Sequence, residues 1–134
     1  MKILIVEDDF TCRHLLQIYL ANYGPTFIAI NGLEAIAAVR QALADKQPYD
    51  LICLDVMMPG MDGWETLRQI REMEEWNGIS GLDCAKVIMT TARSENEDII
   101  KSFREGCEAY IVKPVRKPAL IEQMARLGLL EHAR

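Results

Sequence analysis

The sequence predicts an α/β fold in which five parallel strands form a doubly wound sheet with five helices on its two faces. Two observations predict it. Five short apolar runs alternate with five segments whose apolar residues recur at helical spacing, and strands separated by helices run parallel with right-handed crossovers. The run from Tyr49 to Asp55 shows no polar alternation, which is typical of a strand buried on both faces of a parallel sheet.

The N-terminal third of the chain predicts two strands, each followed by a helix. Lys2–Val6 is an apolar run, and the residues after it have the period of a helix that ends at Gly24. A second short strand is expected over Thr26–Ile30. Asn31 and Glu34 then form a capping box, because the side chain of each can accept a hydrogen bond from the backbone near the other. They predict the start of the second helix.

The middle of the chain contains the central strand. The second helix ends before Pro48, and the strand Tyr49–Asp55 follows. Asp62 and Glu65 repeat the capping pattern at the start of a third helix. The segment from Glu74 to Asp83 contains two glycines, so we expect a loop that is longer than the other connections.

The C-terminal part continues the alternation. Strands are expected at Lys86–Thr90 and Glu108–Val112. Ser94 and Glu97 have the spacing of another capping box, which would begin the helix between these strands. Pro118 suits the first turn of the last helix, where a missing N–H removes no hydrogen bond.

Size and charge restrict the functional class. The chain has 134 residues, the usual size of one domain, and we expect a single domain over residues 1–134 without an output domain. Its net charge of −5 argues against direct binding of nucleic acid or of an anionic membrane. No apolar run is long enough to span a membrane, and Met1 and Lys2 lead directly into a strand without a signal peptide. A cytoplasmic protein is therefore expected.

The cysteines and histidines predict no site of their own. The four cysteines are widely spaced, which indicates reduced thiols rather than disulfides or a zinc site. His14 and His132 have no partner at a meaningful spacing, and we expect both to be surface residues without a role.

Reactive side chains stand where the predicted strands end. They are Glu7, Asp8 and Asp9 after the first strand, Asp55 at the end of the third, Thr90 and Thr91 at the end of the fourth, and Lys113 after the fifth. In a doubly wound sheet these ends meet at one edge, where the strand order reverses. Taken alone, Asp55 could be a nucleophile, a metal ligand or a cap of the following turn.

The grouping of these side chains favours phosphoryl chemistry. Several carboxylates in one pocket repel each other, and a divalent cation relieves that repulsion. Oxygen-only ligands suit magnesium rather than zinc. A lysine and a hydroxyl beside such a cation can bind the oxygens of a phosphoryl group, and a carboxylate is a nucleophile that forms an aspartyl phosphate.

Five motifs in this order carry a family resemblance. They are Val6-Glu7-Asp8-Asp9, Asn31-Gly32-Leu33-Glu34-Ala35, Asp55-Val56-Met57-Met58-Pro59-Gly60-Met61-Asp62-Gly63, Thr91-Ala92 and Tyr110-Ile111-Val112-Lys113-Pro114. On five strand–helix units they resemble the receiver domain of the two-component response regulators, over roughly Lys2 to Leu127. The resemblance implies a flavodoxin-like fold with strand order 2-1-3-4-5.

The resemblance implies a phosphoacceptor and a metal site. Asp55 would accept a phosphoryl group from a sensor histidine kinase or a histidine phosphotransfer protein. Asp8, Asp55 and the backbone carbonyl of Met57 would bind Mg2+ directly, and Glu7 would bind it through water. Asp9 would be only a neighbour or a helix cap, because the five-residue step from Asp8 to Arg13 sets the register.

The resemblance also implies a switch. Lys113 would pair with the phosphoryl oxygens, and the Lys113–Pro114 bond is expected to be cis. Thr91 would be the switch hydroxyl and Tyr110 the switch aromatic, which turns inward when Thr91 moves. The fourth helix, the fifth strand and the fifth helix would form the face that binds a downstream target protein. The domain would not be an enzyme, since it assists only its own phosphorylation and dephosphorylation.

Other readings compete with these assignments. Lys113 could be a solvated lysine, Thr91 a helix cap and Tyr110 a core aromatic. A haloacid-dehalogenase-like phosphatase would need an aspartate where Met57 stands, as its general acid. A nucleotide or flavin carrier would need a phosphate cradle after the first strand, where this chain has acidic residues. An intermediate carrier in a phosphorelay stays open as the alternative to a terminal switch.

Overall fold

The computed structural model describes residues 1–130, so His132 lies outside the described residues. Five parallel strands form one sheet in the order β2-β1-β3-β4-β5. The strands are β1 (Ile3–Val6), β2 (Thr26–Ala29), β3 (Leu51–Asp55), β4 (Lys86–Thr91) and β5 (Ala109–Val112). This order and direction confirm the doubly wound, flavodoxin-like fold.

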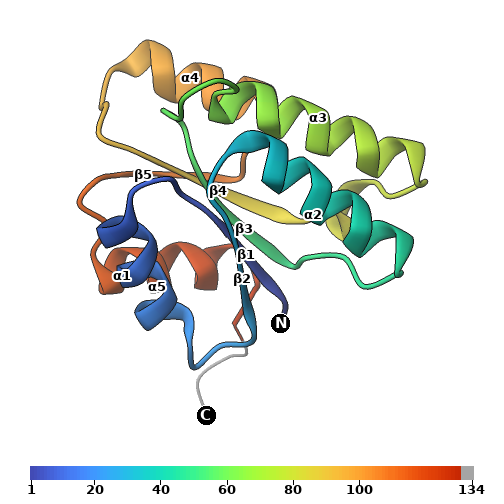
Figure 1. Ribbon diagram of the computed structural model, residues 1–134. Coiled ribbons are helices and arrows are strands. Elements are labelled where there is room, and N and C mark those ends of the chain that lie inside the picture. The colour runs from blue at the N-terminus through green and yellow to red at the C-terminus, as the bar shows by residue number, and fades with distance from the viewer. Residues whose placement is uncertain (131–134) are drawn as a thin grey trace.

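Helices cover both faces of the sheet. They are α1 (Phe10–Leu20), α2 (Gly32–Ala44), α3 (Gly63–Trp76), α4 (Asn96–Glu105) and α5 (Lys117–Arg126). Figure 1 shows α1 and α5 on one face and α2, α3 and α4 on the other. Within residues 1–130, every helix is too short or too polar to cross a bilayer.

The sheet separates two apolar cores. Leu4 and Val6 of β1 pack in the core beneath α2 and α3, whereas Ile3 and Ile5 pack in the core beneath α1 and α5. All four residues of β1 and all five of β3 are buried. Because successive side chains of a strand point to opposite faces, a central strand covered on both faces has an unbroken apolar sequence. The apolar run before Asp55 has this physical cause.

Two of the predicted capping patterns are present, one of them in part. The Asn31 Oδ1 atom accepts a hydrogen bond of 2.8 Å from the N–H of Glu34, whose carboxylate accepts one of 2.8 Å from the N–H of Ile30. At the start of α3 only half of the pattern forms: the Asp62 Oδ1 atom accepts a hydrogen bond of 2.9 Å from the N–H of Glu65, whereas the Glu65 carboxylate accepts from Arg68 and Gln69. These caps satisfy N–H groups that a helix leaves unpaired in its first turn.

The predicted capping box of Ser94 and Glu97 is wrong. Helix α4 begins one residue later, with Glu95 at the N-cap position and no side-chain hydrogen bond in that role. The first turn of α4 is held instead by Asp98, whose Oδ2 atom lies 2.9 Å from Nε of Arg93 in the preceding loop. An ion pair between the preceding loop and the helix has replaced the predicted side-chain cap.

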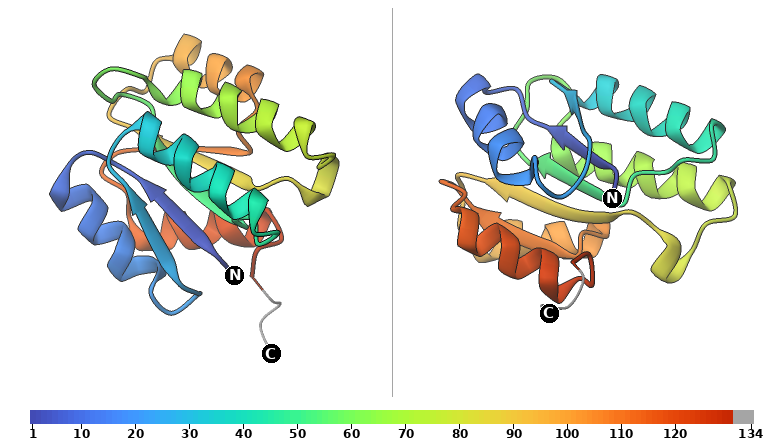
Figure 2. Two further views of the ribbon diagram at one scale, coloured as in Figure 1. Left: turned by 45° about the vertical axis from the view of Figure 1, so that its right-hand side comes forward. Right: turned by 90° about the horizontal axis from the view of Figure 1, so that it is seen from below.

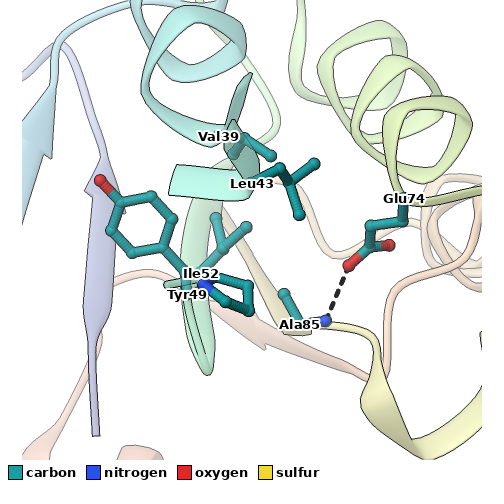
Figure 3. Close-up of a pocket in the computed structure, with 7 residues that line it drawn as sticks. Val39, Leu43, Tyr49, Ile52, Glu74 and Ala85 are labelled. Carbon is teal, nitrogen blue, oxygen red and sulfur yellow. Dashed lines mark hydrogen bonds between the residues drawn. The ribbon is translucent and has the colours of Figure 1, made fainter. Parts of the chain in front are cut away.

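The loop predicted from Glu74 to Asp83 begins later than expected. Helix α3 continues to Trp76, and a short 3-10 turn covers Gly81–Asp83. The chain stays helical because Glu74 is buried, and its Oε2 atom accepts a hydrogen bond of 2.8 Å from the N–H of Ala85. Figure 3 shows this carboxylate at the edge of a small apolar cavity of about 10 Å³, which can hold at most one water molecule.

Candidate functional site

The carboxyl ends of the strands meet at one edge of the sheet, and both views of Figure 2 show the loops after them on that side. Asp55 is the last residue of β3 and pairs in register with Thr90 of β4. It is 3% exposed, and its Oδ1 atom accepts a hydrogen bond of 3.3 Å from the N–H of Met57. The loop after β3 therefore folds back onto the carboxylate that begins it.

A glycine lets helix α3 approach the strand that carries Asp55. A Cβ atom on Gly63 would lie 2.3 Å from the backbone oxygen of Asp55, which is far inside van der Waals contact. The N–H of Gly63 donates a hydrogen bond of 2.8 Å to the carbonyl of Val56. The start of α3 is thus fixed against the end of β3, and any side chain at position 63 would push the two apart.

Three carboxylates gather at this edge. One oxygen from each of Glu7, Asp8 and Asp55 lies within 4.8 Å of the others. Glu7 is fully buried and Asp8 is exposed, so the group opens to solvent on one side only. The sequence predicted this convergence from the strand ends.

Lys113 is the cation beside the buried carboxylates. Its Nζ atom lies 2.8 Å from Oε1 of Glu7 and 3.4 Å from Oδ1 of Asp55. Burial alone would lower the pKa of Lys113, but the two carboxylates outweigh it and the pKa is raised. Its backbone N–H bonds the carbonyl of Thr91 at 2.6 Å, and the Lys113–Pro114 peptide is cis as expected.

The buried negative charge is only partly compensated. Burial raises the pKa of Asp55 to about 7, and the neighbouring Glu7 carboxylate raises it while Lys113 opposes both. Although Lys113 is close to Oε1 of Glu7, that oxygen has no aligned hydrogen-bond partner. Two buried carboxylates facing one ammonium, with Asp8 at the mouth, leave a net negative site.

The donor set fits a hard divalent cation. All three groups are carboxylates, the buried Oε1 atom of Glu7 has the Lys113 ammonium as its one close partner within the described residues, and the exposed side leaves room for water ligands. Carboxylates with water are the usual ligands of magnesium, which keeps part of its hydration shell in proteins. The predicted Met57 carbonyl ligand stays a prediction, since no contact in residues 1–130 tests it.

Asp9 is the N-cap of helix α1. Its Oδ2 atom accepts a hydrogen bond of 2.9 Å from the N–H of Cys12. The side chain of Arg13 binds the backbone carbonyls of Glu7 and Asp8, at 3.1 Å and 3.4 Å, and so fixes the loop between β1 and α1. The expectation that Asp9 caps a helix is confirmed. The cluster of three carboxylates contains Asp8 and not Asp9.

Thr91 and Tyr110 both contact one residue of the β4–α4 loop. The buried Thr91 Oγ1 atom accepts a hydrogen bond of 3.2 Å from the N–H of Arg93. The half-buried Tyr110 donates a hydrogen bond of 2.8 Å from its hydroxyl to the carbonyl of Arg93. The roles of Thr91 and Tyr110 as switch residues stay predictions, but the structure connects them through this loop.

Sequence reasoning missed Arg93 and Asp98. Their ion pair joins a loop residue to the first turn of α4, and the five-residue step between them matches no helical pairing rule. Arginine and aspartate are common surface residues, so nothing in the sequence around Arg93 and Asp98 indicated that they would pair.

Comparison with known families gives one match over most of the chain. A family model described as the response regulator receiver domain matches residues 3–125.

Two relatives and one solved structure illustrate the match. The transcriptional regulatory protein ResD of Bacillus subtilis is 44% identical over 115 residues, which cover 84% of this chain and 42% of ResD. The chain therefore spans less than half of the length of that relative. The chemotaxis protein CheY-3 of Vibrio cholerae is 35% identical, with coverage of 95% of this chain and 91% of CheY-3.

The solved structure is a chain of the CheX–CheY complex with BeF3 and magnesium from Borrelia burgdorferi. It superposes with a TM-score of 0.78 at 27% identity, and the match covers 94% of this chain and 88% of that chain.

Proposed function

The chain belongs to the response regulator receiver domain family, and from this premise we propose that it is a phosphoacceptor switch. Asp55 takes a phosphoryl group from a phosphohistidine of a sensor histidine kinase or a histidine phosphotransfer protein. The observation that carries the proposal is a buried carboxylate at a strand end with a lysine 3.4 Å away and two further acids beside it.

The transfer is a displacement at phosphorus. An Oδ atom of Asp55 forms the new O–P bond while the N–P bond of the phosphohistidine breaks, and the electron pair of that bond returns to the imidazole. Lys113 holds its ammonium where the phosphoryl oxygens arrive, and it also favours the ionised form of Asp55. The domain assists this step on its own side chain only, so it is not an enzyme for other substrates.

Magnesium fits the acidic group. We assign Glu7, Asp8, Asp55 and the Met57 backbone carbonyl as the residues that hold it. When bound, it supplies positive charge that neutralises the phosphoryl oxygens during transfer. The chain itself contributes the buried carboxylates, the lysine and the exclusion of water on the buried side of Asp55.

The output surface lies on α4, β5 and α5. Thr91 and Tyr110 border the β4–α4 loop, so a movement of Thr91 toward the phosphoryl group reaches this face through Arg93. Ile100, Phe103 and Val112 are 55%, 48% and 39% exposed there. We assign the exposed charges Arg104, Arg116 and Lys117 to its rim. Lys101, which was expected there as well, lies over the ring of Trp64 at the start of α3, 4.3 Å from the ring centroid. A downstream protein would bind this face.

The cysteines agree with a reducing compartment. The structure has four free thiols, at Cys12, Cys53, Cys84 and Cys107. Free cysteines without disulfides are typical of proteins in the cytoplasm, where we place this receiver.

Intact mass tests the phosphoacceptor directly. The protein is incubated with magnesium and acetyl phosphate, and we expect one added phosphoryl group that hydroxylamine removes. Asp55→Asn should gain none, whereas the matched control Asp62→Asn, at the N-cap of α3, should gain one. A phosphoryl group on Asp55→Asn would reject the assignment. Transfer from the labelled protein back to a histidine phosphotransfer protein would instead identify a relay carrier.

A further inference from the structure

Arg93 lies between the phosphoacceptor loop and helix α4. Its Nε atom is 2.9 Å from Oδ2 of Asp98, and Nη2 is 3.7 Å from Oε2 of Glu95. On the other side, Nη1 is 3.9 Å from the sulfur of Met57, two residues after Asp55. One guanidinium thus contacts both the first turn of α4 and the loop that folds over the phosphoacceptor.

Asp98 depends on Arg93 for its compensation. The Asp98 side chain is only 12% exposed, while that of Arg93 is 42% exposed. Apart from the ion pair with Arg93, Oδ2 of Asp98 has no aligned hydrogen bond. Removing the cation from a buried carboxylate leaves an uncompensated charge and is strongly unfavourable. The pair therefore holds the first turn of α4 in its present position.

The backbone of Arg93 connects to the switch residues. Its N–H donates to Oγ1 of Thr91, and its carbonyl accepts from the hydroxyl of Tyr110. The side chain and the main chain of one residue therefore contact the phosphoacceptor loop, α4, Thr91 and Tyr110. If the Arg93 side chain changed its partner, the contacts with all four of these sites would change.

We propose that Arg93 is a second cation for the phosphoryl group, and that it exchanges Asp98 for that group when Asp55 is phosphorylated. This inference rests on the proposed function. A phosphoryl group carries more negative charge than one carboxylate, and a guanidinium binds its oxygens with two parallel hydrogen bonds. The side chain is long and 42% exposed, so it can turn from Asp98 toward Asp55 past Met57.

The exchange has a consequence for α4. Asp98 then lacks its cation, and the first turn of α4 either opens or shifts to expose the carboxylate to water. Because α4 belongs to the proposed output face, the ion pair ties the strength of phosphoryl binding to the position of α4. Asp98 and the phosphoryl group compete for the Arg93 guanidinium, so binding of either one weakens binding of the other.

A double-mutant cycle tests the competition. Beryllofluoride, which stands in for the phosphoryl group, is titrated with magnesium present, and 19F resonance reports the bound form. Arg93→Gln should weaken binding about tenfold, the size expected for one charge-assisted hydrogen bond. Asp98→Asn should strengthen binding, because Arg93 is then free. In the double variant, Asp98→Asn should have no further effect.

The controls separate the possible failures. Arg40→Gln removes an exposed arginine of α2 and should leave the affinity unchanged, and thermal melting checks that each variant is folded. If the wild type binds no beryllofluoride, or binds it equally as Asp55→Asn, the proposed function fails. If the wild type binds it at Asp55 but Asp98→Asn changes the affinity equally with and without Arg93, the exchange is wrong.

Hydrogen exchange adds a second readout. In the wild type, beryllofluoride should reduce the protection of amides in residues 96–100. In Arg93→Gln these amides should already be less protected without it and change little on addition. Unchanged protection in the beryllofluoride-bound wild type would overturn the proposed release of α4.

Discussion

The two ends of the sheet both contain buried charge, but they treat it in opposite ways. At the amino end, one arginine of α3 is surrounded by enough acceptors to satisfy it. At the carboxyl end, two buried carboxylates face one lysine, and one of their oxygens has no aligned hydrogen bond. The first arrangement holds the fold together, and the second leaves charge available for a ligand.

Arg71 is the centre of the amino-end network. Its guanidinium donates to Glu74 at 2.8 Å, to the carbonyls of Ala85 and Gly106 at 2.9 Å and 2.7 Å, and to Glu108 at 2.8 Å. Both acids also accept backbone N–H groups at the start of β4. Every charge in the network is paired and hydrogen-bonded, so the network links α3, β4 and the loop before β5.

The carboxyl end lacks that completeness. At both ends two acids share one cation, Arg71 at the amino end and Lys113 at the carboxyl end. The difference is that Glu7 is fully buried and its Oε1 atom has no aligned hydrogen bond. Buried negative charge that is only partly compensated destabilises the fold on its own. Binding a cation would offset that cost, which is why such a charge indicates a functional site. The contrast distinguishes charges that stabilise the scaffold from charges that bind.

The largest expected change in stability comes from the Arg71 network at the amino end of the sheet. Arg71→Met should lower the free energy of unfolding by roughly 3 kcal/mol or more, because it leaves two acids without their cation. Urea denaturation measures the change. The matched control is Arg68→Met, whose exposed pairs with Glu65 and Glu72 on the same helix should contribute less than about 1 kcal/mol. Equal losses for the two variants would break the distinction.

The second prediction is a gain in stability, at the carboxyl end of the sheet. Asp55→Asn should stabilise the magnesium-free protein above about pH 7 by on the order of 2 kcal/mol, because it removes a poorly compensated charge. The unfolded carboxyl titrates near its ordinary value of 3.8, whereas burial raises the folded pKa to about 7. Between these values the folded state binds the extra proton, so wild-type stability falls as the pH rises.

Thermal unfolding across the pH range measures this linkage. The advantage of Asp55→Asn over the wild type should be largest above the folded pKa and should disappear as the pH falls toward the unfolded value. A constant difference at every pH would mean that the amide acts through packing and that the charge at Asp55 is already compensated.

The carboxyl end of the sheet was the more predictable of the two. Parallel strands bring their ends to one edge, so the convergence of Glu7, Asp8, Asp55 and Lys113 follows from the order of strands and helices alone. The caps at Asn31 and Asp62 were also predictable, because each is a pattern of residues three apart.

The amino-end network and the Arg93 pair were not predictable in this way. Arg71 bonds Glu108 across 37 positions of the sequence, and no spacing rule connects two such residues. Arg93 and Asp98 are close in sequence, but a loop separates them, and the local capping pattern of Ser94 was a stronger and misleading signal. Tertiary contacts decide which of two locally acceptable arrangements forms.

The smallest expected effects apply the same distinction to two adjacent residues. The Asp9 carboxylate is satisfied as the cap of α1, and that of Asp8 belongs to the acidic group. Asp9→Ala should lower the free energy of unfolding by about 1 kcal/mol, the usual value of an N-cap, and leave magnesium affinity unchanged. Asp8→Asn should weaken magnesium binding and change stability little.

Asp9→Asn is the matched control, because asparagine caps helices as well as aspartate. Trp64 at the start of α3 is a fluorescent reporter for the titration. A larger loss of affinity in Asp9→Asn than in Asp8→Asn would show that the satisfied carboxylate is the ligand, and the distinction would not hold at the level of single residues.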